Sequence, residues 1–167
     1  MDKRIEQFVA TLEGVLQRQI AVHTELLALM GSKREALASG QARRLTETLQ
    51  LENQKVQAIA ELEKSRLEAV ATLTLLVEPN ATEPMRMSDL AARLPGPAGQ
   101  RIAAMRTQLR ERMEEVRRQT TIARRATESL MRHVQGLIQT IGGAQTYAHR
   151  GRLLQRATGV STFNLVA

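Results

Sequence analysis

The sequence predicts an all-α fold, and three observations support that prediction. The helix formers Ala, Leu, Arg, Glu and Gln are prominent in the 167 residues. Aromatic residues make up only 2% of the chain, which argues against the β-sandwiches and barrels that favour them. Apolar residues recur three or four positions apart over long stretches. We therefore expect three long antiparallel helices forming an elongated bundle or coiled coil, with a short helical turn in one connection and a less regular C-terminal tail.

The first helix is predicted over residues 2–38. Gln19 interrupts its main apolar row, and a second row that includes His23 widens the buried face. Ser39-Gly40 is the expected end, because glycine commonly follows the last turn of a helix. The main row consists of Ile5, Phe8, Leu12, Val15, Val22, Leu26 and Leu29.

The second helix is predicted over residues 41–77, and its partner across the short turn is the first helix. Glu78-Pro79 ends it, since proline disfavours helical geometry in the residue before it. The connection over residues 78–100 holds all four prolines, and Ser88-Asp89 predicts a short helical turn there. The apolar row of this second helix includes Leu45, Leu49, Val56, Ile59, Leu62, Val70, Leu73 and Leu76.

The third helix is predicted over residues 98–141, with Gly142-Gly143 as its end. Every seventh residue from Ile102 to Leu137 is apolar, but the stretch from Glu114 to Glu128 has few large apolar groups. We expect this centre to pack thinly between two better-packed ends. The domain organisation that follows is a helical bundle over residues 1–142 and a partner-binding tail over residues 143–167.

The formal net charge of +7 belongs to the C-terminal part of the chain. Residues 1–77 hold ten basic and ten acidic side chains, whereas residues 101–167 hold twelve basic and four acidic ones. Part of that charge can form a stripe through Arg106, Arg110, Arg117 and Arg124, which leaves a basic nucleic-acid-binding protein as one alternative. The third helix offers no aromatic side chain for base stacking, so nucleic acid is not the favoured partner.

The sequence holds no constellation that indicates catalysis. There is no Cys, and no two of the three histidines have the spacing of a helical metal site. We expect no enzymatic activity, no metal and no cofactor. No apolar run of signal-peptide length begins the chain, and the longest strongly apolar stretch, residues 69–77, is far shorter than the about 20 residues of a spanning helix. A cytoplasmic location is expected.

Both ends of the chain resemble the FlgN-type flagellar export chaperones. At the N-terminal end the similar residues are Leu12, Leu16, the run 23–29, the run 33–37 (Lys-Arg-Glu-Ala-Leu), Leu45, Leu49 and Glu52. At the C-terminal end they are the apolar helix from Leu130 to Ile141, then Thr146-Tyr147 and Gly151.

The resemblance implies an export chaperone that binds the C-terminal helical segments of hook-associated proteins, the proteins of the hook–filament junction. It would prevent their premature assembly and deliver them to the type III export gate, so that its only link to the membrane is the export apparatus. Tyr147 matches the tyrosine associated with docking to the cytoplasmic domain of the gate. A structural coiled-coil protein that self-associates is the other alternative; a chaperone is expected to be a monomer or weak dimer. The expected client-binding residues are Leu130, Leu137, Ile138, Ile141, Leu153 and Leu154.

Overall fold

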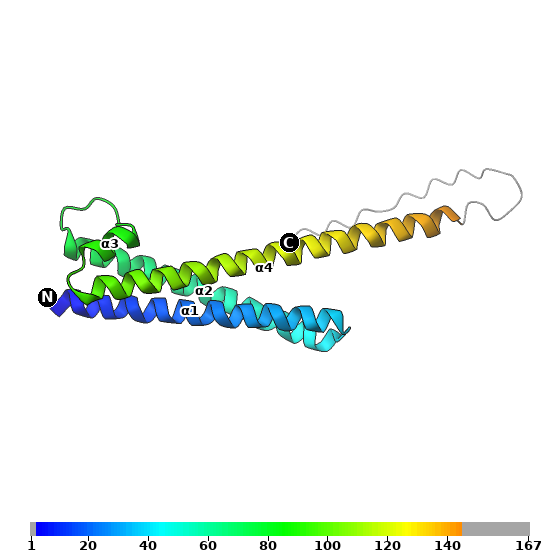
Figure 1. Cartoon of the computed structure of the whole chain (residues 1–167), viewed down its shortest axis with the longest axis horizontal. Helices are drawn as coiled ribbons and strands as arrows, with labels where there is room; N and C mark the ends of the chain where they lie inside the picture. The colour runs from blue at the N-terminus through cyan, green and yellow to red at the C-terminus, as the bar shows by residue number, and fades with distance from the viewer. Residues whose placement is uncertain (1–2, 145–167) are drawn as a thin grey trace, which may run out of the picture. The chain divides into compact units, whose positions relative to one another are not determined.

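The computed structural model describes residues 3–144, with side chains described for residues 3–140. It contains four helices and, within these residues, no strand: α1 (Lys3–Ala38), α2 (Ala42–Val77), α3 (Met87–Arg93) and α4 (Pro97–Ala144) (Figure 1). The all-α class is confirmed. The helix count differs from the predicted three, because the turn expected in the connection is a seven-residue helix of its own. By its internal contacts the chain divides into residues 1–123 and residues 124–167, and α4 contributes to both units.

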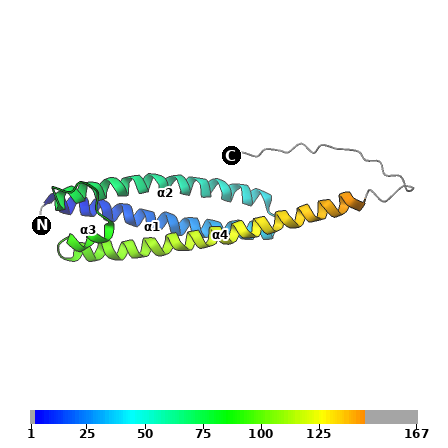
Figure 2. The same cartoon turned by 90° about the horizontal axis from the view of Figure 1, so that it is seen from above.

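A glycine turn joins α1 to α2 in the first unit, as the sequence predicts. Gly40 has a φ of 65°, the left-handed geometry that residues with a Cβ rarely adopt. The amide of Gly40 donates to the carbonyl of Leu37, and that of Gln41 donates to the carbonyl of Ala36 at 2.9 Å. These two bonds are those of a Schellman motif, which satisfies carbonyls left free at the end of α1. The turn sends α2 back alongside α1 (Figure 2).

The core of this unit lies where α1, α2, α3 and the first turns of α4 meet. Leu12, Leu16, Leu73, Leu90 and Ile102 are fully buried in one cluster. Each of the four helices therefore contributes apolar side chains to the same core. The main apolar row of α1 is buried or half-buried throughout, as expected from its spacing.

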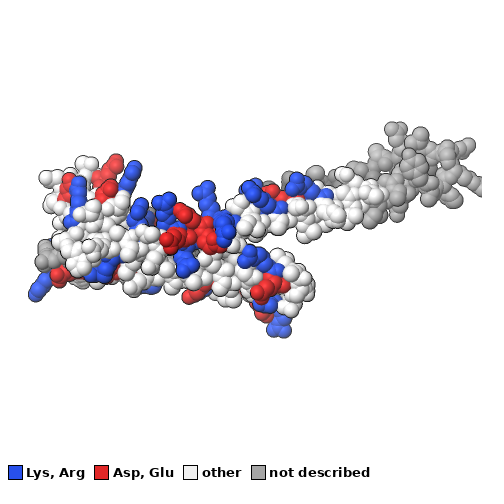
Figure 3. Space-filling model, viewed as in Figure 1, with Lys and Arg blue, Asp and Glu red and all other residues white. Residues whose placement is uncertain are grey.

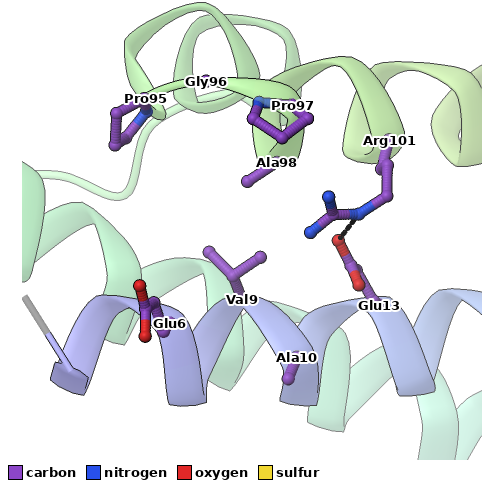
Figure 4. Close-up of a pocket in the computed structure, with 9 residues that line it drawn as sticks. All are labelled: Glu6, Val9, Ala10, Glu13, Pro95, Gly96, Pro97, Ala98 and Arg101. Carbon is purple, nitrogen blue, oxygen red and sulfur yellow. Dashed lines mark hydrogen bonds and ion pairs between the residues drawn. The ribbon is translucent and has the colours of Figure 1, made fainter. Parts of the chain in front are cut away.

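Polar contacts fix the first half of α4 against α1. Arg101 Nε donates to Glu13 Oε1 at 2.8 Å, and Arg34 Nη1 donates to Gln119 Oε1 at 2.6 Å. From the first pair to the second, the residue numbers increase in both helices, so α1 and this part of α4 run in the same direction (Figures 1 and 2). Figure 4 shows the Arg101–Glu13 pair at one end of this junction, with Val9 pointing toward Ala98.

The connection between α2 and α4 is fixed by buried contacts at both of its ends. The buried Thr74 hydroxyl accepts a hydrogen bond from the amide of Met85 at 3.0 Å. The α3 helix then packs so closely on α4 that only a glycine fits at position 99, where an added methyl group would overlap the carbonyl oxygen of Ala91. Gly96, with a φ of 64°, makes the turn into α4.

A layer of polar side chains interrupts the α1–α2 core. Gln19, which breaks the apolar row in the sequence, is only 2% exposed, and its Nε2 donates to Glu63 Oε2 at 3.0 Å. Its Oε1 atom is buried without a hydrogen-bond partner. His23 is buried beside it, with Nδ1 2.7 Å from the carbonyl oxygen of Gln19. Arg66 donates two hydrogen bonds, of 2.6 and 2.8 Å, to Glu63.

Packing differs from the sequence pattern in two places. Leu49 and Val56 of the apolar α2 row are exposed, and the charged pair Lys33–Glu52, at 2.6 Å, links α1 and α2 at that level. The C-terminal end of α4 is not well packed either, since Leu130 and Leu137 are exposed. The helix also runs through Gly142-Gly143, where its end was predicted. No helix in the described part of the chain is both long and apolar enough to cross a membrane.

Candidate functional site

The second half of α4 presents apolar side chains to solvent. Every side chain from residue 124 to residue 140 is exposed. Five of them are large and apolar, with exposed fractions between 44% and 64%. We call this set the apolar stripe: Leu130, Met131, Val134, Leu137 and Ile138.

The spacing of these residues places them on one face of the helix. Successive residues of an α-helix turn by about 100°, so the five side chains fall within an arc of about 120°. The charged residues between positions 124 and 140 all lie outside that arc. Two of them form an ion pair, in which Arg124 Nε lies 2.8 Å from Glu128 Oε1. The segment is therefore an amphipathic helix whose apolar face has no cover in the described structure.

An apolar face of this kind points to binding. Single exposed apolar residues are ordinary on protein surfaces, but a contiguous apolar patch marks an interaction site. Anchors at i, i+4, i+7 and i+8 are also the pattern by which one amphipathic helix packs against another. The arrangement can hold a helix with a complementary apolar face, and it carries no group suited to bond-making or bond-breaking.

The predicted site residues fall into two groups. Leu130, Leu137 and Ile138 lie together on the apolar stripe. Ile141 belongs to α4 and continues the stripe by its register, but its side chain lies outside the described residues. Tyr147, Leu153 and Leu154 lie outside the described residues altogether.

The prediction missed two residues of the stripe, Met131 and Val134. Both are exposed and lie between the predicted residues on the same face. A helical projection of the sequence contains that signal, because position 134 is four residues from position 130 and position 138. Met131 lies outside the seven-residue row and Val134 lies on its flank, because the stripe does not follow a strict seven-residue repeat.

Two carboxylates in the described structure are held by several hydrogen bonds each. Glu115 on α4 is bound by Arg118 at 2.8 Å through two nitrogens and by Gln119 at 2.7 Å, and these bonds lower its pKa to about 2. The bonds from Arg66 lower the pKa of Glu63, with a smaller contribution from Gln19. Both carboxylates stay charged at neutral pH. Among the described residues no group of three His, Asp or Glu side chains is arranged to hold a metal ion.

One concave feature at the α1–α4 junction does not resemble a catalytic site. It is a hollow of about 470 Å³ beneath the Pro95-Gly96-Pro97 turn, opposite Glu6 (Figure 4). Buried Val9 and Ala98 line it, and the charged side chains of Glu13 and Arg101 form an ion pair with each other.

Comparison with known protein families identifies the family of this chain. A family model described as FlgN protein matches residues 1–153, which is most of the chain. The chain belongs to the FlgN family. This is the flagellar export chaperone family, whose members serve flagellar assembly and type III export. Comparisons with curated proteins and with solved structures found no match.

The residues matched by the family model include the apolar stripe. A chaperone needs a surface that can cover apolar parts of another protein. The family match extends through the stripe and over Tyr147 and Leu153. It therefore includes the described surface and the first part, up to residue 153, of the C-terminal segment in which the sequence predicts partner contacts.

Proposed function

We propose that this protein is a cytoplasmic export chaperone for hook-associated proteins, and that the apolar stripe holds their C-terminal helical segments. The observation that carries the proposal is the exposed, one-sided apolar face of α4 between residues 130 and 138. Ile141, Leu153 and Leu154 extend the binding surface in this proposal. Tyr147 docks the loaded chaperone on the cytoplasmic domain of the export gate.

The stripe suits a client helix because each partner hides the apolar face of the other. A client segment that assembles through an amphipathic helix exposes that face until it reaches its place in the filament. Covering it on the chaperone blocks premature assembly by simple mass action, without nucleotide hydrolysis. The bundle of residues 1–123 acts as a stable support from which α4 continues.

The area of the stripe sets a scale for affinity. Full burial of a Leu, Ile, Val or Met side chain contributes about 1.5–3 kcal/mol. The five stripe residues are roughly half exposed, so each contributes about 1 kcal/mol and the set about 5 kcal/mol. That value corresponds to binding between about 1 mM and 1 μM before the costs of association. Tight client binding therefore requires further contacts, and the apolar residues 153 and 154 are the proposed source.

The proposal is tested by mixing the full chain with a peptide from the C-terminal helix of a hook-associated protein. A complex should co-elute in size-exclusion chromatography at tens of micromolar, and free chaperone should elute as a monomer or weak dimer. Absence of any complex at that concentration would overturn the proposal. A stable oligomer that ignores the peptide would favour the alternative, a coiled-coil protein that associates with itself through the same stripe.

A further inference from the structure

A second surface, in the first unit, lies between α2, the connection and α4. Two hollows of about 790 and 500 Å³ open there, and both are lined by Arg66, Met87 and Arg106. They are therefore one continuous groove, which we call the basic groove. It lies entirely within residues 63–117 and shares no residue with the apolar stripe.

The apolar lining of the groove is rich in methionine. Met85 and Met87 come from the connection and α3, and Leu109 and Met113 come from α4. Leu109 is buried, whereas Met113 is more than half exposed. Methionine side chains are flexible and polarisable, so they adapt to the apolar face of a partner helix.

The charged lining of the groove is basic and only partly neutralised. It comprises five arginines and three glutamates. Glu63 pairs with Arg66 at 2.6 Å, and Glu114 pairs with Arg110 at 2.8 Å. The other three arginines have no ion pair with any residue that the structure describes: Arg86, Arg106 and Arg117. Figure 3 shows basic side chains gathered over the first half of α4, with acidic ones among them.

The groove arginines of α4 follow the groove rather than cluster at one point. Arg106, Arg110 and Arg117 are spaced by four and seven residues, so they lie on one face of α4 over about 16 Å, or three helical turns. An apolar trough with positive charge along it matches an amphipathic helix whose apolar face is flanked by Glu or Asp.

Charge argues against an occupant from this chain. Residues 145–167 contain three arginines and no acidic residue, and residues 124–144 contain three arginines and one glutamate. Either segment, from the same or a second copy, brings positive charge to a positive groove. The lining also lacks aromatic side chains, on which the bases of single-stranded nucleic acid would stack.

We propose that the basic groove docks an acidic amphipathic helix of a partner protein. This is a second docking surface, separate from the client surface on α4, so a chaperone that holds a client can engage another protein through its bundle at the same time. The groove recognises its partner by apolar contact with the methionines and by charge pairing with Arg86, Arg106 and Arg117.

The test uses the full chain and a designed helical peptide of about 18 residues, with leucines three and four positions apart and glutamates beside them. A matched peptide carries lysine in place of every glutamate. Fluorescence anisotropy with labelled peptides, at about 0.15 M ionic strength, should show saturable binding of the acidic peptide at least about tenfold tighter than that of the lysine peptide. Equal binding of the two peptides would overturn the proposal.

Two variants locate the site. Arg106→Glu should weaken binding of the acidic peptide about tenfold or more, because it reverses an unpaired charge in the groove. Arg112→Glu is the matched control: it makes the same charge change at an exposed position of α4 that does not line the groove, and binding should change less than about threefold. An equal loss of affinity in both variants would show that binding depends only on net charge, and it would overturn the proposal.

Two further readouts separate the remaining possibilities. Leu130→Asp, on the apolar stripe, should leave acidic-peptide binding unchanged; a comparable loss would assign the peptide to the client surface and overturn the second site. A single-stranded RNA of similar length should fail to displace the peptide. Displacement by equimolar RNA would make the groove a nucleic-acid site instead. Circular dichroism of each variant should show the helical signal and melting of the parent protein, since all of these positions are exposed.

Discussion

Replacement of Gly99 by alanine is predicted to destabilise the bundle, although alanine is the better helix former. Inside a helix this change normally stabilises by about 1 kcal/mol, because glycine has more backbone freedom to lose on folding. At position 99 the added methyl group would overlap the carbonyl oxygen of Ala91 and lie 3.1 Å from that of Leu94. Both obstacles are backbone atoms, so no side-chain rotation can make room.

The size of the effect follows from these two opposing contributions. Overpacking of a well-packed site costs about 1–3 kcal/mol, and contact with two fixed carbonyl groups corresponds to the upper part of that range. After the gain of about 1 kcal/mol in helix propensity, a net loss of about 2 kcal/mol is expected. Urea unfolding followed by circular dichroism at 222 nm measures it, since the chain has no Trp for fluorescence.

Gly31→Ala is the matched control for this prediction. Gly31 lies inside α1, and an added methyl group there meets nothing within 4 Å. The same chemical change should therefore stabilise the protein by about 0.5–1 kcal/mol. If Gly99→Ala were as stable as Gly31→Ala, the close packing of α3 on α4 would be refuted.

Three more predictions concern other parts of the molecule. Gln19→Leu should raise the free energy of unfolding by about 1 kcal/mol, because it removes a buried oxygen without a partner while Arg66 still binds Glu63; a loss of 2 kcal/mol or more, measured by urea unfolding, would contradict this. The melting temperature should be flat from about pH 8 to pH 5 and should fall below about pH 4.5, because the pKa values of Glu63 and Glu115 are lowered in the folded state and the unfolded state then binds more protons. Glu115 loses its contribution to stability as the pH approaches about 2. A melting temperature that does not depend on pH in this range would refute the prediction. Tyr147→Ala should weaken binding to the cytoplasmic domain of the export gate in a pull-down without changing the helical circular-dichroism signal, whereas loss of the helical signal would assign Tyr147 to the core.

The sequence predicted the helices well because their signals are local. The apolar spacing of α1 and the Ser39-Gly40 stop require only neighbouring residues, and Gly40 has the positive φ that such a stop needs. A short helical turn in the connection was also expected, but Ser88 and Asp89, predicted as its caps, lie inside α3, which begins after Arg86. The packing of α3 was not expected, because the overlap that forces a glycine at position 99 depends on where α3 meets α4.

Burial was harder to predict than helix formation. The seven-residue row from Ile102 to Leu137 looks uniform in the sequence, yet Ile102 is buried and Leu137 is exposed. An apolar helix face with this pattern can pack in a core or remain exposed to bind a partner, and only the tertiary arrangement decides between the two. Gln19 shows the reverse case: it breaks the apolar row but is buried, because Glu63 of α2 supplies a hydrogen-bond acceptor.

The candidate site was predicted in part for the same reason. Leu130, Leu137 and Ile138 were expected to bind a client, and the structure shows them exposed on one face. Their role stays a prediction, as do those of Ile141, Leu153, Leu154 and Tyr147. Of the basic groove, only the spacing of the arginines could be predicted from the sequence. Two of its methionines belong to the connection and α3, and only the fold brings them next to α4.

Client binding by the apolar stripe is tested most directly by comparing two double variants of α4. Leu130→Asp with Leu137→Asp places two charges on the stripe, whereas Gln135→Asp with Gln139→Asp places the same two charges on the opposite, polar part of the helix. Isothermal titration with the C-terminal segment of a hook-associated protein should show the stripe variant binding about 100-fold more weakly, from about tenfold for each lost anchor. The control should stay within about threefold of the parent protein. Equal affinities of the two variants would contradict the proposed client surface.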